Sequence, residues 1–485
     1  MDTKINNNKE LKLWEALIPV VALIGMLAFN VFIYGDASLG GSNQFVLLLG
    51  GAVAAIVGYF NKVSFHKMLD EVANNIKSTA GAILILLMVG ALAGTWMVSG
   101  IIPSMIYYGL QILSPAIFLP ATLIICSVIS IATGSSWTTS ATVGIALIGI
   151  GGALGFDLGM VAGAVISGAY FGDKLSPMSD TTNLAPAMAG TDLFTHIKYM
   201  TLTTIPTYII TLILFIILGL SIEVKGDVNT NELLKAITTS FNVSGWLFLV
   251  PIIVIGLIVK KTEPLVALLV GTLLAGIFAV IFQPQIINQI AGVETMDFKS
   301  AYKGVMDAIT SKVVVPTENK TLADLFTSGG MAKMLPTIWL ILCAMVFGGI
   351  MDAIGALARI SESLLKLAHT TFGLFASTVG SCLALNITAS DQYLAIVVPG
   401  KMFAKAYKDK GLAPENLSRT LEDTGTVTSV LVPWNTCGAY QAGTLGVSTL
   451  DYLPYAFFNI ISPFMTLIFA AFNIKIKQLV SSIKE

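Results

Sequence analysis

The chain has 485 residues, of which 55% are hydrophobic and only 11% are charged, and its formal net charge is −1. A soluble globular protein carries about 25% charged residues, so this composition excludes an ordinary soluble domain. The balanced charge offers no basic surface for a nucleic acid. Four cysteines lie far apart and three histidines are scattered, which excludes a disulfide scaffold and a histidine metal cluster. The sequence therefore predicts an all-α polytopic membrane protein.

Apolar runs that are long enough to form membrane helices recur along the whole chain. The first run is too long for the apolar part of a signal peptide and has no small-residue cleavage site after it, so we expect a retained helix. Several later runs are short or interrupted by glycine, and we do not expect each of them to cross fully. The expected segments are 13–33, 44–60, 80–99, 115–133, 136–154, 158–171, 201–221, 245–259, 264–282, 336–354, 372–385, 392–403, 430–446 and 452–472.

Lysine and arginine placement predicts which loops face the cytoplasm, because cytoplasmic loops carry an excess of these residues. The expected cytoplasmic segments are both termini and the basic loops 61–79, 260–261, 358–370 and 401–419. The expected outer segments are 34–43, 100–114 and the long connection 284–334, which mixes both signs.

A repeat divides the chain into two halves. Residues 133–142 (TGSSWTTSAT) have a counterpart in residues 386–395 (NITASDQYLA), 253 positions later, and Asp173 has a counterpart in Asp423, 250 positions later. Apolar runs repeat at similar separations. We therefore divide the chain into a cytoplasmic tail (1–12), a first repeat (13–222), an extracellular linker (223–244), a second repeat (245–474) with an extracellular insertion (284–334), and a cytoplasmic tail (475–485).

Loops that match between the halves differ in charge: where one is basic, its partner is not. This pattern predicts an inverted-topology repeat, which is a recurrent plan of secondary transporters. The preferred arrangement has about ten full spans, two re-entrant hairpins and two discontinuous helices. The hairpin tips are expected at 133–139 and 386–392. Two full crossings in each hairpin would give the same sidedness, and this alternative stays open.

Two polar segments break otherwise apolar stretches, at residues 172–183 and 421–438. Backbone at membrane depth must be satisfied internally or line a watery cavity, and an ionisable side chain there usually marks an ion path. Carboxylates, hydroxyls, amides and free carbonyls are the oxygen ligands that a hard cation such as Na⁺ needs. The predicted cation- or proton-binding residues are Asp180, Asp173, Asp391, Asp423, Asn183, Thr181, Ser136, Thr139, Asn386, Thr388, Ser390 and Asn435, with Asp180, Asp173, Ser136 and Thr139 as Na⁺ ligands.

Simpler interpretations of these residues stay open at this point. Asp173 is adjacent to Lys174 and could form a structural ion pair, and Asp391 could cap a helix. Glu422 and Asp423 could be solvated at a helix end, and the hydroxyl residues around Ser136 could only cap a hairpin.

Competition for one carboxylate is the physical basis of an antiporter. Burial disfavours the ionised form of a carboxylate, so a desolvated carboxylate holds a proton or a metal ion, but not comfortably both. No hydrolase or metalloprotease motif (GxSxG or HExxH) occurs, so we expect a transporter rather than an enzyme, with no cofactor besides the transported ions.

Residues 133–142, 170–183 (YFGDKLSPMSDTTN) and 422–438 (EDTGTVTSVLVPWNTCG) resemble the NhaC-type Na⁺/H⁺ antiporter family. The resemblance implies a multi-pass protein of the bacterial inner membrane that exchanges Na⁺ for H⁺. It also implies a transport domain, framed by hairpin tips and broken helices, that slides against a scaffold. Because the family includes exchangers of carboxylates such as malate and lactate, a small carboxylate is an alternative substrate. A homo-oligomer in the lipid bilayer is compatible with the resemblance.

Overall fold

The computed structural model describes residues 11–34, 40–221, 230–317 and 326–479, and almost all of this part of the chain is helical. Among the described residues, eight helices are long and apolar enough to cross a membrane, or up to ten if each of two bent helix pairs forms one span. The predicted all-α polytopic membrane fold is confirmed. The inversion of one half relative to the other stays a prediction, as does the count of ten full spans beside two hairpins.

The helices of the first half follow the apolar runs of the sequence closely. The main difference is at 65–98, where most of the expected cytoplasmic loop 61–79 and the expected span 80–99 form one continuous helix. The elements are α1 (Leu13–Tyr34), α2 (Ser42–Phe60), α3 (Phe65–Val98), α4 (Ile101–Ile112), α5 (Pro115–Thr133), α6 (Ser136–Thr139), the π-helical turn η2 (Ser140–Gly144), α7 (Ile145–Ala153), α8 (Leu158–Leu175), α9 (Asp180–Ala189) and α10 (Leu193–Ser221).

The second half contains the same kinds of helix and one short antiparallel strand pair, β1 with β2. Its elements are α11 (Thr230–Ser240), η3 (Gly245–Phe248), α12 (Leu249–Val259), α13 (Pro264–Phe282), α14 (Pro284–Ala291), α15 (Phe298–Thr310), β1 (Val313–Val314), β2 (Thr327–Ser328), η4 (Met331–Met334), α17 (Leu335–Ala353), α18 (Ala356–Leu365), α19 (Thr371–Thr388), α20 (Leu394–Asp409), α21 (Pro414–Leu421), the π-helical turn η5 (Glu422–Thr426), η6 (Ser429–Leu431), α22 (Thr436–Leu445), α23 (Thr449–Tyr452), η7 (Leu453–Tyr455) and α24 (Phe457–Ala471).

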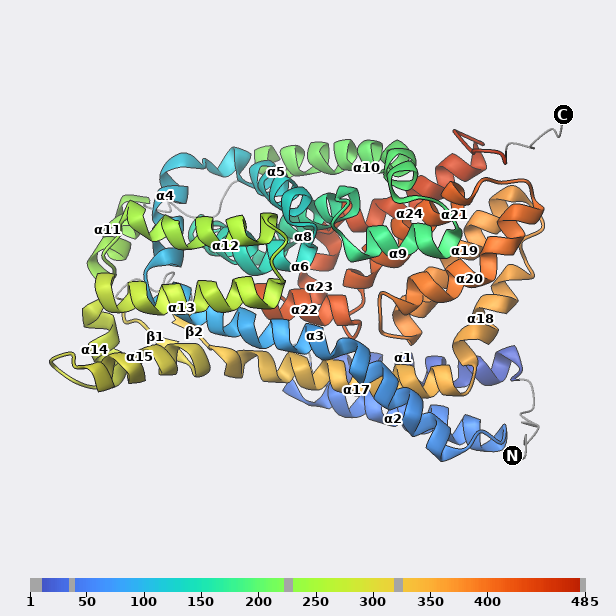
Figure 1. Ribbon diagram of the computed structural model, residues 1–485, viewed down its shortest axis with the longest axis horizontal. Coiled ribbons are helices and arrows are strands. Elements are labelled where there is room, and N and C mark those ends of the chain that lie inside the picture. The colour runs from blue at the N-terminus through green and yellow to red at the C-terminus, as the bar shows by residue number, and fades with distance from the viewer. Residues whose placement is uncertain (1–10, 35–39, 222–229, 318–325, 480–485) are drawn as a thin grey trace.

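The two ends of the molecule differ in which loops they carry. Helices α11, α14 and α15 lie at one end of the long axis, and α18 and α20 lie at the other end (Figure 1). The basic loops next to α18 and α20 are therefore far from α14 and α15, which belong to the connection 284–334, as opposite sides of a membrane would require. Which end is cytoplasmic stays a prediction. Residues 1–10, 222–229 and 480–485, which belong to the expected tails and linker, lie outside the described residues.

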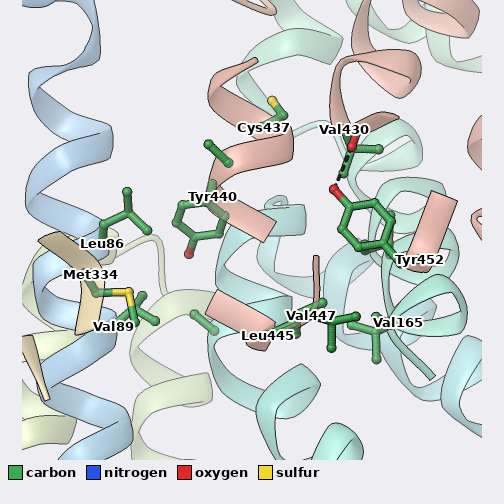
Figure 2. Packing of buried hydrophobic residues seen from close by; sticks show 14 of the residues in the cluster. Leu86, Val89, Val165, Met334, Val430, Cys437, Tyr440, Leu445, Val447 and Tyr452 are labelled. Carbon is green, nitrogen blue, oxygen red and sulfur yellow. Dashed lines mark hydrogen bonds between the residues drawn. The ribbon is translucent and has the colours of Figure 1, made fainter. Parts of the chain in front are cut away.

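Helices α1, α2, α3, α13 and α17 pack on one another as one group, and α5, α8, α10 and α24 pack as a second group. In Figure 1, α2, α3 and α17 lie along one edge of the molecule, while α5 and α10 lie along the opposite edge. Helix α22 contacts α3 and α17 of the first group, and it also contacts η2 and α7, which pack against α8 of the second group. Figure 2 shows Tyr440 of α22 on the side of Leu86 of α3, while Leu445 of α22 lies near Val447 and near Val165 of α8.

The order of elements supports the repeat, but in a slightly different register. Left-handed backbone conformations recur 255 or 256 positions apart, at Gly100 and Gly355, Gly134 and Ser390, Gly155 and Gly411, and Gly190 and Gly446. Asp173 then matches Ser429 rather than Asp423. The offset between the halves that the sequence indicated, 250 to 253 positions, is a few residues smaller than this spacing. The sequence comparison aligned polar side chains, whereas the structure repeats the left-handed residues.

Glycine allows α5 and α8 to approach closely. A Cβ atom added at Gly172 would lie 2.5 Å from the Ser127 carbonyl oxygen and 2.5 Å from the Ser130 Cβ, and 2.7 Å from the Ile131 nitrogen. Helix α8 therefore rests directly on the backbone of α5, which fixes the end of α8 where the predicted break begins.

We expect Gly172→Ala to lower the free energy of unfolding by about 1–3 kcal/mol, the usual cost of overpacking a tight contact. The midpoint of thermal aggregation in detergent measures it. Gly256→Ala in α12 is the matched control, because nothing lies within 4 Å of a Cβ added there. Equal midpoints for the two variants would contradict the close approach.

Candidate functional site

The turn between α5 and α6 directs a backbone N–H and a hydroxyl at a buried carboxylate. Gly134 adopts the left-handed conformation (φ 69°) that ends α5, and the next helical run begins at Ser136. Ser136 donates to Asp173 Oδ2 from its backbone nitrogen at 3.0 Å and from its Oγ at 2.7 Å. Asp173 Oδ1 is buried and has no hydrogen-bond partner in the described part of the chain. The first hairpin tip and the first break therefore meet at Asp173.

The break between α8 and α9 exposes a second carboxylate. Ser179 caps α9 by accepting from the Thr182 nitrogen at 3.3 Å, and Asp180 Oδ1 accepts from the Thr181 nitrogen at 2.8 Å. Asp180 Oδ2 accepts a hydrogen bond from the Tyr393 hydroxyl, which lies beside the second hairpin tip. Asp180 thus links the first break to the opposite half of the chain.

The second tip, between α19 and α20, carries Asp391. Ser390 has a left-handed backbone (φ 59°) where the first tip has glycine, a conformation that costs a residue with a Cβ about 1 kcal/mol. The Ser390 carbonyl accepts from the Thr436 nitrogen at 3.0 Å. Asp391 is buried, and its Oδ1 accepts from the Leu394 nitrogen at 3.0 Å. The helix-capping interpretation of Asp391 therefore applies, although Asp391 also faces the cavity described below.

Lys174 forms an ion pair with Asp423, not with its sequence neighbour Asp173. Both side chains are fully buried, and Asp423 also accepts from the Thr466 hydroxyl. This pair joins the end of α8 to the π-helical turn η5, so it connects the two breaks. The solvated interpretation of Glu422 and Asp423 is wrong, because both are fully buried.

One cavity of about 660 Å³ joins these parts. Both hairpin tips and the first break line it, together with α3, the start of α22 and the turn between α12 and α13. Of the predicted site residues, Asp173, Asp180, Asp391 and Ser136 line the cavity. The other predicted residues are outside its lining: Thr139, Thr181, Asn183, Asn386, Thr388, Ser390, Asp423 and Asn435.

Most of those other residues serve the local structure. Thr139 Oγ1 donates to the Ser135 carbonyl at 2.9 Å, and Asn183 Nδ2 donates to the Ser179 carbonyl at 2.6 Å. Asn386 and Asn435 bond to each other, with Asn435 Nδ2 at 3.1 Å from the Asn386 carbonyl oxygen. Thr139 is therefore the one predicted Na⁺ ligand that does not reach the cavity. Ion binding by any of the residues that line the cavity stays a prediction.

Several lining residues were not expected from the sequence. Tyr393 lies two positions after Asp391, and its place in the sequence is typical of an ordinary helix residue. Thr436 and Cys437 lie inside the predicted second break, but they were not among the predicted site residues. Residues 78–85 of α3 and 261–264 of the α12–α13 turn belong to segments without a polar interruption at membrane depth. A local pattern gives no signal for residues that reach the site only through packing of distant helices.

Four helices begin beside the cavity, and in each of them at least one N–H group of the first turn is already bonded. A helix N-terminus can hold an anion through these groups, but here the protein provides its own acceptors. The acceptors are Asp173 for α6, Ser179 and Asp180 for α9, Asp391 for α20, and Asn435 and the Ser390 carbonyl for α22. Acceptors of the protein itself therefore take up part of the anion-binding capacity of each of these helix starts.

Within the described residues, no group of three or more His, Cys, Asp or Glu side chains is arranged to hold a metal ion. A Na⁺ ion here would combine a carboxylate with hydroxyl and carbonyl oxygens. Asp173 Oδ1, which has no partner, is the kind of oxygen that such an ion requires. A transported cation at these residues stays a prediction.

The chain has relatives over most of its length. A protein of Alkalihalophilus pseudofirmus named Na(+)/H(+) antiporter NhaC is 37% identical over 87% of this chain and 88% of its own. A Malate-2H(+)/Na(+)-lactate antiporter of Bacillus subtilis is 36% identical over 94% of both chains. The arginine/ornithine antiporter ArcD of Halobacterium salinarum is 33% identical over 94% of this chain and 90% of its own.

These relatives are named as antiporters, which are transporters rather than enzymes. Residues 168–474 match the family described as "Na+/H+ antiporter family". This range includes both the first break and the whole second half. The motifs that resembled NhaC-type proteins therefore led to the right family. This chain belongs to the Na⁺/H⁺ antiporter family.

Proposed function

We propose that this protein exchanges Na⁺ for H⁺ across the bacterial inner membrane, with both termini in the cytoplasm. The cavity at the two tips is the site, and Asp173 and Asp180 are the carboxylates for which Na⁺ and H⁺ compete. An ionised carboxylate that is buried without a compensating cation raises the free energy of the protein. When Na⁺ leaves the carboxylate a proton would therefore bind in its place, and when the proton leaves Na⁺ would bind.

The charge of the cavity carries this proposal. Three aspartates line it, and the nearby helix N-termini are bonded to acceptors of the protein itself. Lys174, which could have held a carboxylate substrate, is paired with Asp423 and does not line the cavity. This arrangement favours a cation over an anion.

A second candidate is Na⁺/H⁺-coupled exchange of a small carboxylate. It is favoured by the 36% identity to the Malate-2H(+)/Na(+)-lactate antiporter of Bacillus subtilis, which extends over 94% of the chain. Such a substrate would need donors, and Lys261 and Thr262 in the α12–α13 turn are the lining residues that could supply them.

Purified protein in vesicles with an internal pH dye distinguishes the two functions. Equal K⁺ with valinomycin holds the membrane potential near zero. Sodium chloride or lithium chloride is added outside, or potassium malate or potassium lactate replaces an equivalent amount of external potassium chloride. We expect Na⁺ to raise the internal pH as protons leave, with no protein-dependent effect of the two potassium salts. Protein-free vesicles correct for passive entry of lactic acid.

A proton flux driven by malate or lactate without any Na⁺ response would overturn the proposed cation exchange in favour of carboxylate exchange. A proton flux that Na⁺ drives only when lactate accompanies it and malate is on the opposite side would favour the coupled exchanger. No response under any of these conditions, including this combination, would overturn both.

A further inference from the structure

The cavity is much larger than the ion that the proposed function assigns to it. Its volume is about 660 Å³, whereas one water occupies about 30 Å³ in the liquid, and a bare Na⁺ needs less. Pockets of about 300–1,000 Å³ are typical of sites for small organic molecules. The volume therefore leaves room for a cargo with a carbon skeleton.

The charge of the lining selects the sign of such a molecule. Asp173, Asp180, Asp391 and Glu263 line the cavity, and Lys261 is the single basic residue among the described residues that do so. Asp180 is exposed to the cavity. The lining thus offers more carboxylates than ammonium groups, which favours a positively charged molecule.

An aromatic wall accompanies the carboxylates. Trp137 lines the cavity, and its ring stacks on Tyr440 with centroids 3.9 Å apart and planes 15° from parallel. The Tyr440 hydroxyl donates to the Trp137 carbonyl at 3.0 Å, which holds the pair in place. Tyr393 adds a second aromatic side chain. Aromatic faces attract organic cations, whereas a hydrated Na⁺ gains little from a tryptophan.

We infer that the cavity binds a small organic cation with a guanidinium head group, in competition with Na⁺. A guanidinium is planar, donates pairs of N–H bonds to carboxylates and stacks on aromatic rings, so it matches the aspartates and Trp137 together. This inference rests on the proposed cation site, since it places both cations at the same carboxylates.

Methylguanidinium is the probe, because it keeps its charge up to about pH 12 and does not cross the bilayer as a neutral base. In the vesicle assay, we expect methylguanidinium to raise the apparent KM for Na⁺ without changing the maximal rate. At ten times its dissociation constant the rise is about tenfold, as simple competition requires. Methylurea, its neutral analogue, serves as the control and should have no effect.

Trp137→Leu tests the aromatic wall. We expect the ratio of the inhibition constant for methylguanidinium to the KM for Na⁺ to increase about tenfold. Trp137→Phe keeps a ring and should restore most of the difference. A change in Na⁺ affinity alone, with the ratio constant, would indicate a merely structural role for Trp137 and would overturn its part in binding.

The outcomes separate this inference from the proposed function. If Na⁺ drives protons and methylguanidinium has no effect, or inhibits without raising the KM, the cavity is a watery access path for Na⁺ and the inference is wrong. If methylguanidinium drives protons and Na⁺ does not, the organic cation site stands and the proposed Na⁺ exchange fails.

Discussion

We expect Asp173→Asn to lower the rate of Na⁺-driven proton movement in vesicles at least about 100-fold at subsaturating Na⁺. The change keeps the size of the side chain and removes its charge, so the buried Oδ1 that lacks a partner becomes a weak ligand and cannot exchange a proton. A lost interaction of a charged group of about 3 kcal/mol corresponds to this factor. The measurement is the initial rate of internal alkalinisation after addition of NaCl.

Three variants serve as comparisons for Asp173→Asn. The rate of Na⁺-driven proton movement should fall less in Asp180→Asn, because Asp180 is exposed in the cavity and already accepts a hydrogen bond from Tyr393. Ser136→Ala keeps the Asp173 carboxylate, and its rate of Na⁺-driven proton movement should fall about tenfold. Asp409→Asn, an exposed residue at the end of α20, should behave as the unchanged protein. Full exchange in Asp173→Asn would contradict this site, and full exchange in Asp180→Asn would remove Asp180 from it.

Lys174→Met should lower the free energy of unfolding by about 3–5 kcal/mol, since removal of one partner leaves the Asp423 charge buried and uncompensated. This is a large part of the roughly 5–15 kcal/mol that is typical of folded proteins. The midpoint of thermal aggregation in detergent, followed by size-exclusion chromatography, measures the effect.

The double variant Lys174→Met/Asp423→Leu should recover most of this stability, because two apolar side chains of similar size replace the buried pair. Lys366→Met is the matched control: Lys366 pairs with Glu362 at 3.0 Å, with 63% and 45% of the side chains exposed, and an exposed pair contributes about 0–1 kcal/mol. Equal midpoints for Lys174→Met and Lys366→Met would show that the buried pair does not stabilise the fold.

The helices and the breaks could be predicted from the sequence because their signals are local. Residues 115–133 form α5 as expected, and the polar segment 172–183 contains the end of α8 and the start of α9. Pro177 and the capping residue Ser179 are visible in the sequence. The meeting of the two tips at one cavity agrees with the hairpin interpretation.

The partners of the polar residues could not be predicted, because they lie far apart in the chain. Asp423 lies 249 positions after Lys174, and the nearer Asp173 was the simpler expectation for an ion pair. Asn386 and Asn435 look like ion ligands in the sequence but bond to each other. Likewise, nothing near residues 261–264 indicates that this turn lines the cavity.

The Lys174–Asp423 pair also limits how the protein can change its access from one side to the other. Its two residues come from opposite halves, and pulling them apart in an apolar interior would cost several kcal/mol. Because the pair joins the two breaks, we expect the carboxylates that line the cavity to move together as one unit. A change of access is then expected to shift this unit relative to α3 and α17 rather than to separate its two halves.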